Sequence, residues 1–348
     1  LFSLQSSKID IKQLKIENTF NYRQQLLFNI ANSSFELSGL AFVKNSLPFS
    51  PVFSIDEGCF LIRNSKIDWS SFDVLFRIES ASINVLINDT EITNNFGCLF
   101  RGVFGVNLSL YNSNVVQNDS ANESLVGVID SRFLVKNSSL IKNSGTNIFR
   151  TDNSVLSVED ALLSRNFCKE TFVRAENCSI SWNNTHSSSN FAYSTIIDTR
   201  ESKTEVYDSV FNKDWAPSIS SFRGSLTIKQ TVFEDNRGYN KVFIRTVNST
   251  AEILSSSFKD ESLIGLIRAS NQIRLENLIF SSKPEFSLPK NLRGICVNCK
   301  FGHVSHTSPR GCYWWIRKIA LLFLFAFILF KLRKRIRVLA KRVMPFTF

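Results

Sequence analysis

A repeat of about 24 residues constrains the fold of this chain more than any other feature of its sequence. Apolar residues, which we call the anchors, recur at nearly constant intervals. The anchors are Ile11, Leu37, Ile62, Ile87, Leu110, Val135, Val158, Trp182, Val206, Ile228, Ile253 and Leu275. A repeat of this length is typical of a solenoid, in which each repeat forms one coil and buries its apolar side chains against the neighbouring coils.

A second apolar position lies five residues after each anchor, and Ser187 is the single exception. Because side chains alternate along a flat strand, an odd offset would put the two positions on opposite faces. We therefore expect a corner between them, two residues after the anchor, where Asn and Asp tolerate left-handed backbone. Amides stacked at this corner would form ladders. The corner residues are Asn64, Asn112, Asn137, Asp160, Asn184, Asp208, Gln230 and Asn277.

A third apolar segment, the closing segment, ends each repeat, for example at residues 52–55, 148–151 and 243–246. Each coil therefore holds about three short strands joined by polar turns. Stacked coils would pair these strands in parallel around an apolar interior. Leucine-rich repeats are the alternative at this period, but they need a helical segment in each repeat, and no 3.6-residue periodicity is present.

The residues after each second apolar position complete the pattern as Phe-x-x-Asn or a variant of it. The matches are Phe42 to Asn45, Phe211 to Asp214 and Phe233 to Asn236, with weaker versions at Ile92 to Asn95, Val115 to Asn118, Leu140 to Asn143 and Leu163 to Asn166. This pattern resembles the right-handed parallel β-helix (pectin-lyase-like) superfamily and the repeats of large protist surface proteins. The resemblance covers roughly residues 1–286 and implies an all-β fold, a right-handed parallel β-helix of about 12 coils.

The repeat also sets the expected domain boundaries. Residues 1–286 form the β-helix, and Leu1–Leu4 match a closing segment, so we expect further coils and a signal peptide upstream of this chain. Residues 287–312 lose the repeat and form a cap or stalk. This segment contains Cys296 and Cys299 in a Cys-x-x-Cys motif, which favours a disulfide over a compressed zinc site.

Residues 313–330 predict one transmembrane α-helix, in which Ile319–Phe330 are uninterruptedly apolar and Arg317 and Lys318 would extend to the membrane surface. Its eighteen residues would span about 27 Å, close to the thickness of the bilayer core of about 30 Å. Nine basic residues and no acidic ones follow Cys312, and seven of the nine follow Phe330, so residues 331–348 form a basic cytoplasmic tail that would contact anionic lipid. The helix would place the β-helix outside the cell membrane in a single-pass type I arrangement. A helix lying in the membrane interface, or a buried helix, is the alternative.

The residues after Cys312 explain most of the net charge of +11, since residues 1–312 carry 32 basic against 30 acidic groups. This balance excludes a nucleic-acid partner for the β-helix. Nine Asn-x-Ser/Thr sequons indicate passage through the secretory pathway as a glycoprotein. They begin at Asn32, Asn88, Asn107, Asn118, Asn122, Asn137, Asn177, Asn183 and Asn248. Cys168 and Cys178 lie within one coil, and we expect them to be able to form a second disulfide.

An outward-facing column of the closing segments contains candidate ligand-binding residues. The column includes Arg77, Arg101, Gly127, Arg150, Arg174, Asp198, Ser221, Arg245 and Arg268. The six arginines form a possible binding stripe for an anionic glycan or a protein. Carboxylates two residues further on would pair with them as a surface ladder, for example Glu79, Asp152 and Glu176. The neighbouring pairs Asp56/Glu79 and Asp152/Glu176 leave a glycosidase open as the alternative.

These observations predict a non-enzymatic cell-surface protein whose β-helix serves adhesion, recognition or coat formation. The Gly-His-Gly and Arg-x-Lys motifs of polygalacturonase-like β-helix enzymes are missing, so the resemblance carries over no catalytic residue. No cofactor or metal is expected. The alternatives are a membrane-anchored polysaccharide lyase or glycoside hydrolase, and a purely structural stalk. The break in the repeat at His186–Asn190 predicts a local bulge or a binding loop.

Overall fold

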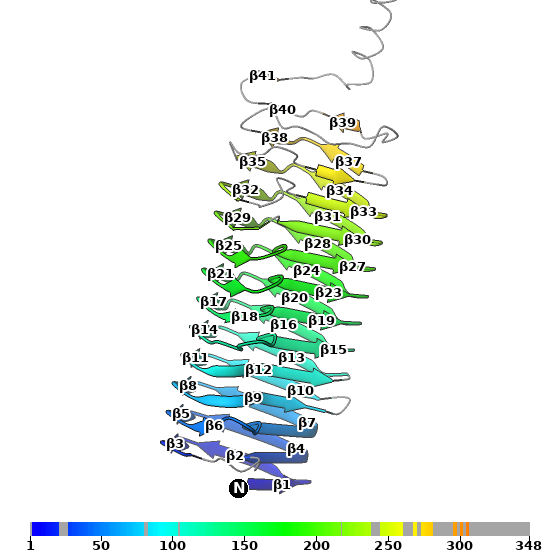
Figure 1. Cartoon of the computed structure of the whole chain (residues 1–348). Coiled ribbons are helices and arrows are strands. Elements are labelled where there is room, and N and C mark those ends of the chain that lie inside the picture. The colour runs from blue at the N-terminus through cyan, green and yellow to red at the C-terminus, as the bar shows by residue number, and fades with distance from the viewer. Residues whose placement is uncertain are drawn as a thin grey trace, which may run out of the picture.

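The chain forms a parallel β-solenoid of about ten turns, in which successive coils stack from β1 at one end to β38 near the other (Figure 1). The structure is a computed structural model. The described residues are 2–20, 27–79, 83–103, 105–216, 218–237, 244–259, 267–269, 273–280, 295–297, 300–301 and 304–305. No helix occurs within these ranges.

Each coil contributes strands to three long rows. The closing row holds β1 (Phe2–Gln5), the first part of β4 (Phe28–Ser38) and of β7 (Phe53–Arg63), β9 (Ser71–Ile78), β12 (Phe96–Val103), β15 (Val126–Ile129), β19 (Phe149–Asp152), β23 (Val173–Glu176), β27 (Ile197–Arg200), β30 (Ile219–Phe222), β33 (Ile244–Val247) and β36 (Ile267–Ala269). The anchor row holds β2 (Lys8–Lys12), the ends of β4 and β7, β10 (Asn84–Asn88), β13 (Asn107–Tyr111), β16 (Arg132–Lys136), β20 (Val155–Glu159), β24 (Ser179–Asn183), β28 (Lys203–Tyr207), β31 (Ser225–Lys229), β34 (Thr250–Leu254), β37 (Ile273–Glu276) and β39 (Ile295–Val297).

A third row and a short row complete the coils. The third row holds β3 (Lys15–Glu17), β5 (Ala41–Val43), β8 (Lys66–Asp68), β11 (Glu91–Thr93), β14 (Asn114–Val116), β17 (Ser139–Ile141), β21 (Leu162–Ser164), β25 (His186–Ser188), β29 (Val210–Asn212), β32 (Val232–Glu234), β35 (Ser257–Lys259), β38 (Ile279–Phe280), β40 (Lys300–Phe301) and β41 (Val304–Ser305). The short row holds β6 (Ser46–Leu47), β18 (Ser144–Gly145), β22 (Phe167–Cys168) and β26 (Phe191–Ala192). Every pairing of the described strands is parallel except that of β40 with β41.

The sequence repeat predicts the register of the anchor row correctly. All twelve anchors pair in one continuous column from Ile11 to Leu275. The eight predicted corner residues all have positive φ, between 46° and 54°, which turns the chain from the anchor row into the third row. The corner is therefore confirmed, and it lets the odd offset point both apolar positions inward.

Stacked aromatic rings fill the core along the solenoid axis. Phe28, Phe53, Phe76 and Phe100 occupy one column and are fully buried, with successive ring centroids 4.8, 5.1 and 5.0 Å apart. A second column stacks Phe211 on Phe233 and Phe233 on Phe258. The spacing matches the distance between hydrogen-bonded strands, so each coil adds one ring to a continuous apolar interior.

A continuous asparagine ladder lies at the other end of the third row, whereas at the predicted corners an amide joins neighbouring coils at Asn184, whose Nδ2 donates to Asp160 Oδ1 at 2.7 Å. The members of the ladder are the last residues of the Phe-x-x-Asn pattern: Asn45, Asn95, Asn118, Asn143, Asn166, Asn190, Asp214 and Asn236, all buried, with Ser70 between the first two. Each side-chain oxygen accepts a hydrogen bond from the backbone N–H of the preceding coil, as Asn143 does from Asn118 at 3.0 Å. Each amide N–H donates to a backbone carbonyl, as Asn143 does to Val115 at 2.8 Å.

Ser187 and Asp214 form a coupled exception within this ladder. Asp214 replaces an asparagine and is fully buried, and its oxygens accept hydrogen bonds from Ser187 Oγ at 2.8 Å and from the Asn190 backbone N–H at 2.8 Å. Ser187 lies in the regular strand β25 with its side chain buried. The expected bulge or loop at this position is therefore absent, and Ser187 supplies the donor that a carboxylate requires.

Candidate functional site

The arginine stripe follows the outer face of the closing row as one column. Arg77 pairs in register with Arg101, Arg101 with Gly127, Gly127 with Arg150, and Arg150 with Arg174. The column continues through Asp198 and Ser220 to Arg245 and Arg268. The predicted member Ser221 is wrong by one position, since Ser220 lies in the column and Ser221 is buried.

A cleft of about 570 Å³ opens in this column, where Gly127 lies between Arg101 and Arg150. Gly127 carries no side chain, and a Cβ built on it would approach only the Phe100 carbonyl oxygen, at 3.9 Å. The missing side chain therefore leaves a hollow between two arginines. Sequence reasoning placed Gly127 in the column but did not recognise the cleft, because the cleft arises from an absent side chain.

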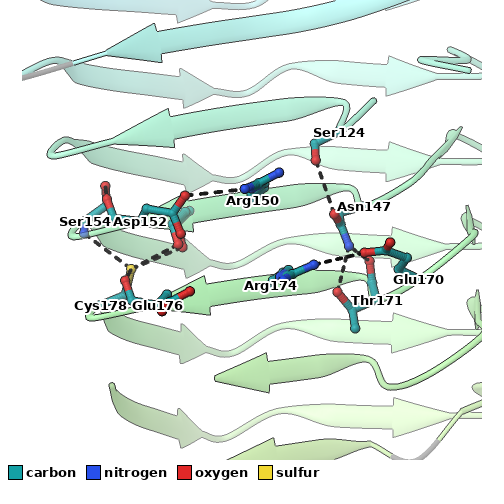
Figure 2. A network of polar contacts seen from close by, with 11 residues as sticks. Ser124, Asn147, Arg150, Asp152, Ser154, Glu170, Thr171, Arg174, Glu176 and Cys178 are labelled. Carbon is teal, nitrogen blue, oxygen red and sulfur yellow. Dashed lines mark hydrogen bonds and ion pairs between the residues drawn. The ribbon is translucent and has the colours of Figure 1, made fainter. Parts of the chain in front are cut away.

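The turn at residues 121–125 forms one wall of the cleft through Asn122, Glu123 and Ser124. Ser124 Oγ donates to Asn147 Oδ1 at 3.3 Å, and Asn147 Nδ2 donates to Thr171 Oγ1 at 2.7 Å, so three coils are joined (Figure 2). Lys169 Nζ donates to Asn122 Oδ1 at 2.7 Å from two coils further along the solenoid. These bonds fix the turn against the next two coils of the solenoid.

Each cleft arginine is held by a carboxylate that is itself partly exposed. Arg150 lies 3.7 Å from Asp152, and Arg174 lies 3.1 Å from Glu170 (Figure 2). Arg101 pairs with Glu123 and lies 3.8 Å from Asp73. Outside the cleft, Arg77 pairs with Glu79 at 2.5 Å, as predicted. The predicted partner of Arg174 was Glu176, and this pairing is wrong because Glu170, on the turn before β23, lies closer.

These ion pairs leave the guanidinium groups available to a ligand. Exposed pairs contribute little free energy, because water screens them. A guanidinium carries five N–H donors, and one carboxylate uses at most two of them. Three arginines on three coils therefore present a row of free donors across the cleft, and the three lining carboxylates balance their charge. A ligand with acidic and hydroxyl groups matches this alternation.

Cys98 lies at the cleft and is not suited to act as a nucleophile. Burial raises the pKa of its thiol to about 12, so the thiol stays protonated at neutral pH. Nowhere in the described ranges do three or more His, Cys, Asp or Glu side chains gather as a metal site would require.

The structure tests several sequon and cysteine predictions. Seven of the nine sequon asparagines are exposed and Asn88 is half-buried, whereas Asn118 is buried in the asparagine ladder. Asn118 is therefore excluded as an acceptor in the folded chain. Asn122 is exposed at the cleft wall, so a glycan there would lie at the mouth of the cleft.

Cys168 and Cys178 are free thiols, so the predicted disulfide between them is wrong. Cys168 lies in the short row. Cys178 lies after the closing row, at a position where the neighbouring coils have Ser154 and Ser202. Its sulfur accepts a hydrogen bond from the Ser154 backbone N–H at 3.3 Å, as the serine hydroxyls do in their own coils. The two residues belong to one coil but to different corners of it. Cys296 is described only as part of β39, and Cys299 lies outside the described residues.

Among the described residues, no helix is long and apolar enough to cross a membrane. The expected transmembrane helix at residues 313–330 and the basic tail at residues 331–348 lie outside them. The cap at residues 287–312 is described only at β39, β40 and β41.

Comparison with known proteins gives no family assignment. No family model and no curated protein matches the chain. Among solved structures, HetL, a pentapeptide repeat protein involved in heterocyst differentiation regulation in Nostoc sp. strain PCC 7120, is 10% identical, with 60% of this chain and 85% of HetL covered and a TM-score of 0.19. A PL6 alginate lyase in complex with a trisaccharide is 9% identical, with 88% and 86% covered and a TM-score of 0.19. Scores this low carry no argument about function.

Proposed function

We propose that the chain is a non-enzymatic cell-surface protein that recognises an extracellular ligand through the cleft between Arg101 and Arg174. The observation that carries this proposal is the cleft itself, in which the glycine gap at Gly127 exposes three arginines on three coils. A ligand bearing carboxylate or sulfate groups with adjacent hydroxyl groups, such as an acidic glycan, fits this lining. A protein ligand would contact the same arginines through its acidic side chains.

The surface location is part of the proposal and comes from the sequence. The β-helix, right-handed and of about 12 coils, would be extracellular, the segment 313–330 would span the membrane once, and the basic tail would face the cytoplasm. The exposed sequons agree with this arrangement, because glycan attachment needs an accessible asparagine in the secretory pathway.

Binding rather than catalysis is favoured by the way the cleft carboxylates are engaged. A retaining glycosidase needs two carboxyl groups flanking the scissile bond. Asp152 and Glu176 are register partners, but Asp152 is tied to Arg150, and Glu176 is not part of the cleft lining. Cleavage of a polysaccharide that is lost in Glu79→Gln or Glu176→Gln would support the alternative of a lyase or hydrolase.

The ligand-binding test uses a panel of sulfated, carboxylated and neutral polysaccharides presented to the full chain. We expect binding to at least one acidic member that falls by about tenfold or more in Arg150→Gln, since a charge-assisted hydrogen bond contributes about 1.5–3 kcal/mol. Arg77→Gln is the matched control, because Arg77 occupies the same column outside the cleft. Equal losses in both variants, or binding that is indifferent to Arg150, would contradict the proposed site.

The surface location is tested by protease treatment of sealed cells that express the chain with a tag after Phe348. We expect the β-helix to be digested and the tag to be protected. Protection of both would place the solenoid inside the cell and end the surface proposal.

A further inference from the structure

A second column of exposed side chains follows the short row, on a part of each coil that precedes the cleft wall. In register order it contains Phe20, Ser46, Ser71, Phe96, Asp119, Ser144, Phe167, Phe191 and Trp215. Most members in the first coils are small or polar, but the last three are aromatic. We call Phe167, Phe191 and Trp215 the aromatic ridge.

The residues of the aromatic ridge follow one another along the solenoid axis, one in each of three consecutive coils. Phe167 and Phe191 are stacked, with centroids 5.0 Å apart and ring planes within 6°. The Arg237 guanidinium lies over the Trp215 ring at 5.4 Å from its centroid and covers that end of the ridge. Phe167 is 47% exposed and Trp215 45% exposed, so the ridge presents a large apolar surface to solvent. Scattered single residues of this kind are ordinary, whereas three consecutive coils of them mark an interaction surface.

Cations border the ridge on both sides. Arg165 and Lys213 precede Phe167 and Trp215 by two residues and occupy exposed corners with positive φ. Lys169 and the highly exposed Tyr193 follow on the other side. Within the described part of the chain, no carboxylate forms an ion pair with Arg165, Lys169, Lys213 or Arg237. Arg165 and Lys213 belong to a second column of positive-φ residues, at the end of the third row, and the acidic Asp235 occupies the same position one coil beyond Lys213. This border differs from the cleft, where every arginine has a carboxylate partner.

We infer that the aromatic ridge is a docking site for a protein with an acidic surface around an apolar centre. Trp, Tyr, Phe and Arg are the residues most enriched in the centres of protein interfaces. Ring edges carry the positive part of the aromatic quadrupole, and stacking directs these edges outward, so they suit carboxylate and carbonyl oxygens. The unpaired cations add the same preference. The inference is independent of the cleft and of its ligand.

The geometry argues against two other occupants. A sugar ring stacks its apolar side on an aromatic face, but one face of Phe167 is stacked on Phe191 and one face of Trp215 is covered by Arg237. A second copy of this chain, docked ridge to ridge, would bring the unpaired cations together. Like charges at close range are unfavourable, so self-association through this surface is disfavoured.

The test presents the immobilised full chain with two matched peptide libraries. In one library Asp and Glu flank a central Trp, Phe or Leu, and in the other Lys and Arg replace the acidic residues. We expect enrichment from the acidic library alone, and we expect the selected peptides to bind Trp215→Ala at least about tenfold more weakly, as for an interface hot spot. Arg237→Glu should weaken them by a similar factor.

Two controls separate this result from a general loss of structure. Trp69→Ala removes a 64% exposed aromatic residue far along the solenoid and should leave peptide binding unchanged. Unchanged urea midpoints would show that the ridge variants are folded. The inference is overturned if neither library is enriched, if Trp215→Ala binds the selected peptides as the wild type does, or if heparin binding depends on Trp215 while peptide binding does not.

Discussion

The asparagine ladder and the arginine column are built by the same repeat, yet the ladder is buried and the column is exposed to solvent. Both place one polar side chain in every coil, and both run along the solenoid axis. In the ladder, Asn143 is fully buried, and its amide is bonded to the coils on either side. In the column, Arg150 is half-exposed, and it is held by one carboxylate at 3.7 Å.

Burial decides what each column does. A buried amide must satisfy every donor and acceptor within the protein, because an unpaired one costs about 1–3 kcal/mol. The ladder is therefore regular and tolerates a change only when a neighbour compensates for it. Water satisfies the exposed column at no cost, so its members vary between Arg, Gly, Asp and Ser, and this variation produces the cleft.

The largest effect should come from a break in the ladder. Asn143→Leu removes the acceptor of two Asn118 donors and the donor to Val115. We expect the free energy of unfolding to fall by about 3 kcal/mol, measured by urea denaturation. Arg150→Gln is the comparison, with an expected change below about 0.5 kcal/mol. Similar changes in the two variants would remove the distinction between the columns.

The next effect concerns pH, through Asp214. Burial raises the pKa of Asp214 to about 7, against the lowering effect of the bonds from Asn190 and Ser187. The folded chain thus keeps a proton that the unfolded chain releases near pH 4, so the free energy of unfolding falls as pH rises from about 4 to about 7 and is level above that.

Asp214→Asn restores the ladder amide and should remove this slope. Between pH 5 and pH 8, we expect the free energy of unfolding of the wild type to fall by roughly 2–3 kcal/mol relative to that of the variant. Urea denaturation at each pH measures this difference. Parallel pH profiles for the two proteins would show that Asp214 titrates at its ordinary value.

A smaller effect should follow from the loss of the compensating hydroxyl. Ser187→Ala deprives Asp214 of a donor at 2.8 Å and should reduce the free energy of unfolding by about 1–2 kcal/mol above pH 7. The loss should largely disappear when Asp214→Asn is also present. An equal loss in both backgrounds would mean that Ser187 acts independently of Asp214.

The smallest effect on stability should come from filling the cleft. Gly127→Arg continues the arginine column into open space and should change the urea midpoint little, while it blocks ligand entry. Gly145→Ala is the comparison, because a Cβ there would lie 2.9 Å from the backbone carbonyl oxygen of Glu123 and would also meet Ser120 Oγ, and we expect clear destabilisation. Acidic-polysaccharide binding that survives Gly127→Arg would place the ligand elsewhere.

The features that the sequence predicts well are those that recur at the same position in every coil. The anchors and corner residues were found because the repeats place an inward-facing apolar residue and a left-handed corner at the same positions in successive coils. The continuous ladder was expected at the other corner because both corners carry Asn, and sequence alone does not show which corner is buried. Amide hydrogen bonds to the neighbouring coils identify the correct one.

Features that depend on a single coil were harder to predict. Ser187 looked like a break because its partner, Asp214, lies 27 residues downstream. Glu170 was missed as the partner of Arg174 because it lies on a turn of irregular length rather than two residues along the strand. The cleft combines both difficulties, since it needs one absent side chain and one longer turn.

The most direct test of the central claim is the triple variant Arg101→Gln, Arg150→Gln, Arg174→Gln, examined by urea denaturation and by acidic-polysaccharide binding on the same sample. If the cleft arginines serve recognition rather than the fold, the free energy of unfolding should stay within about 1 kcal/mol of the wild type while binding is lost. A fall of several kcal/mol, or retained binding, would show that these arginines hold the solenoid together and that recognition lies elsewhere.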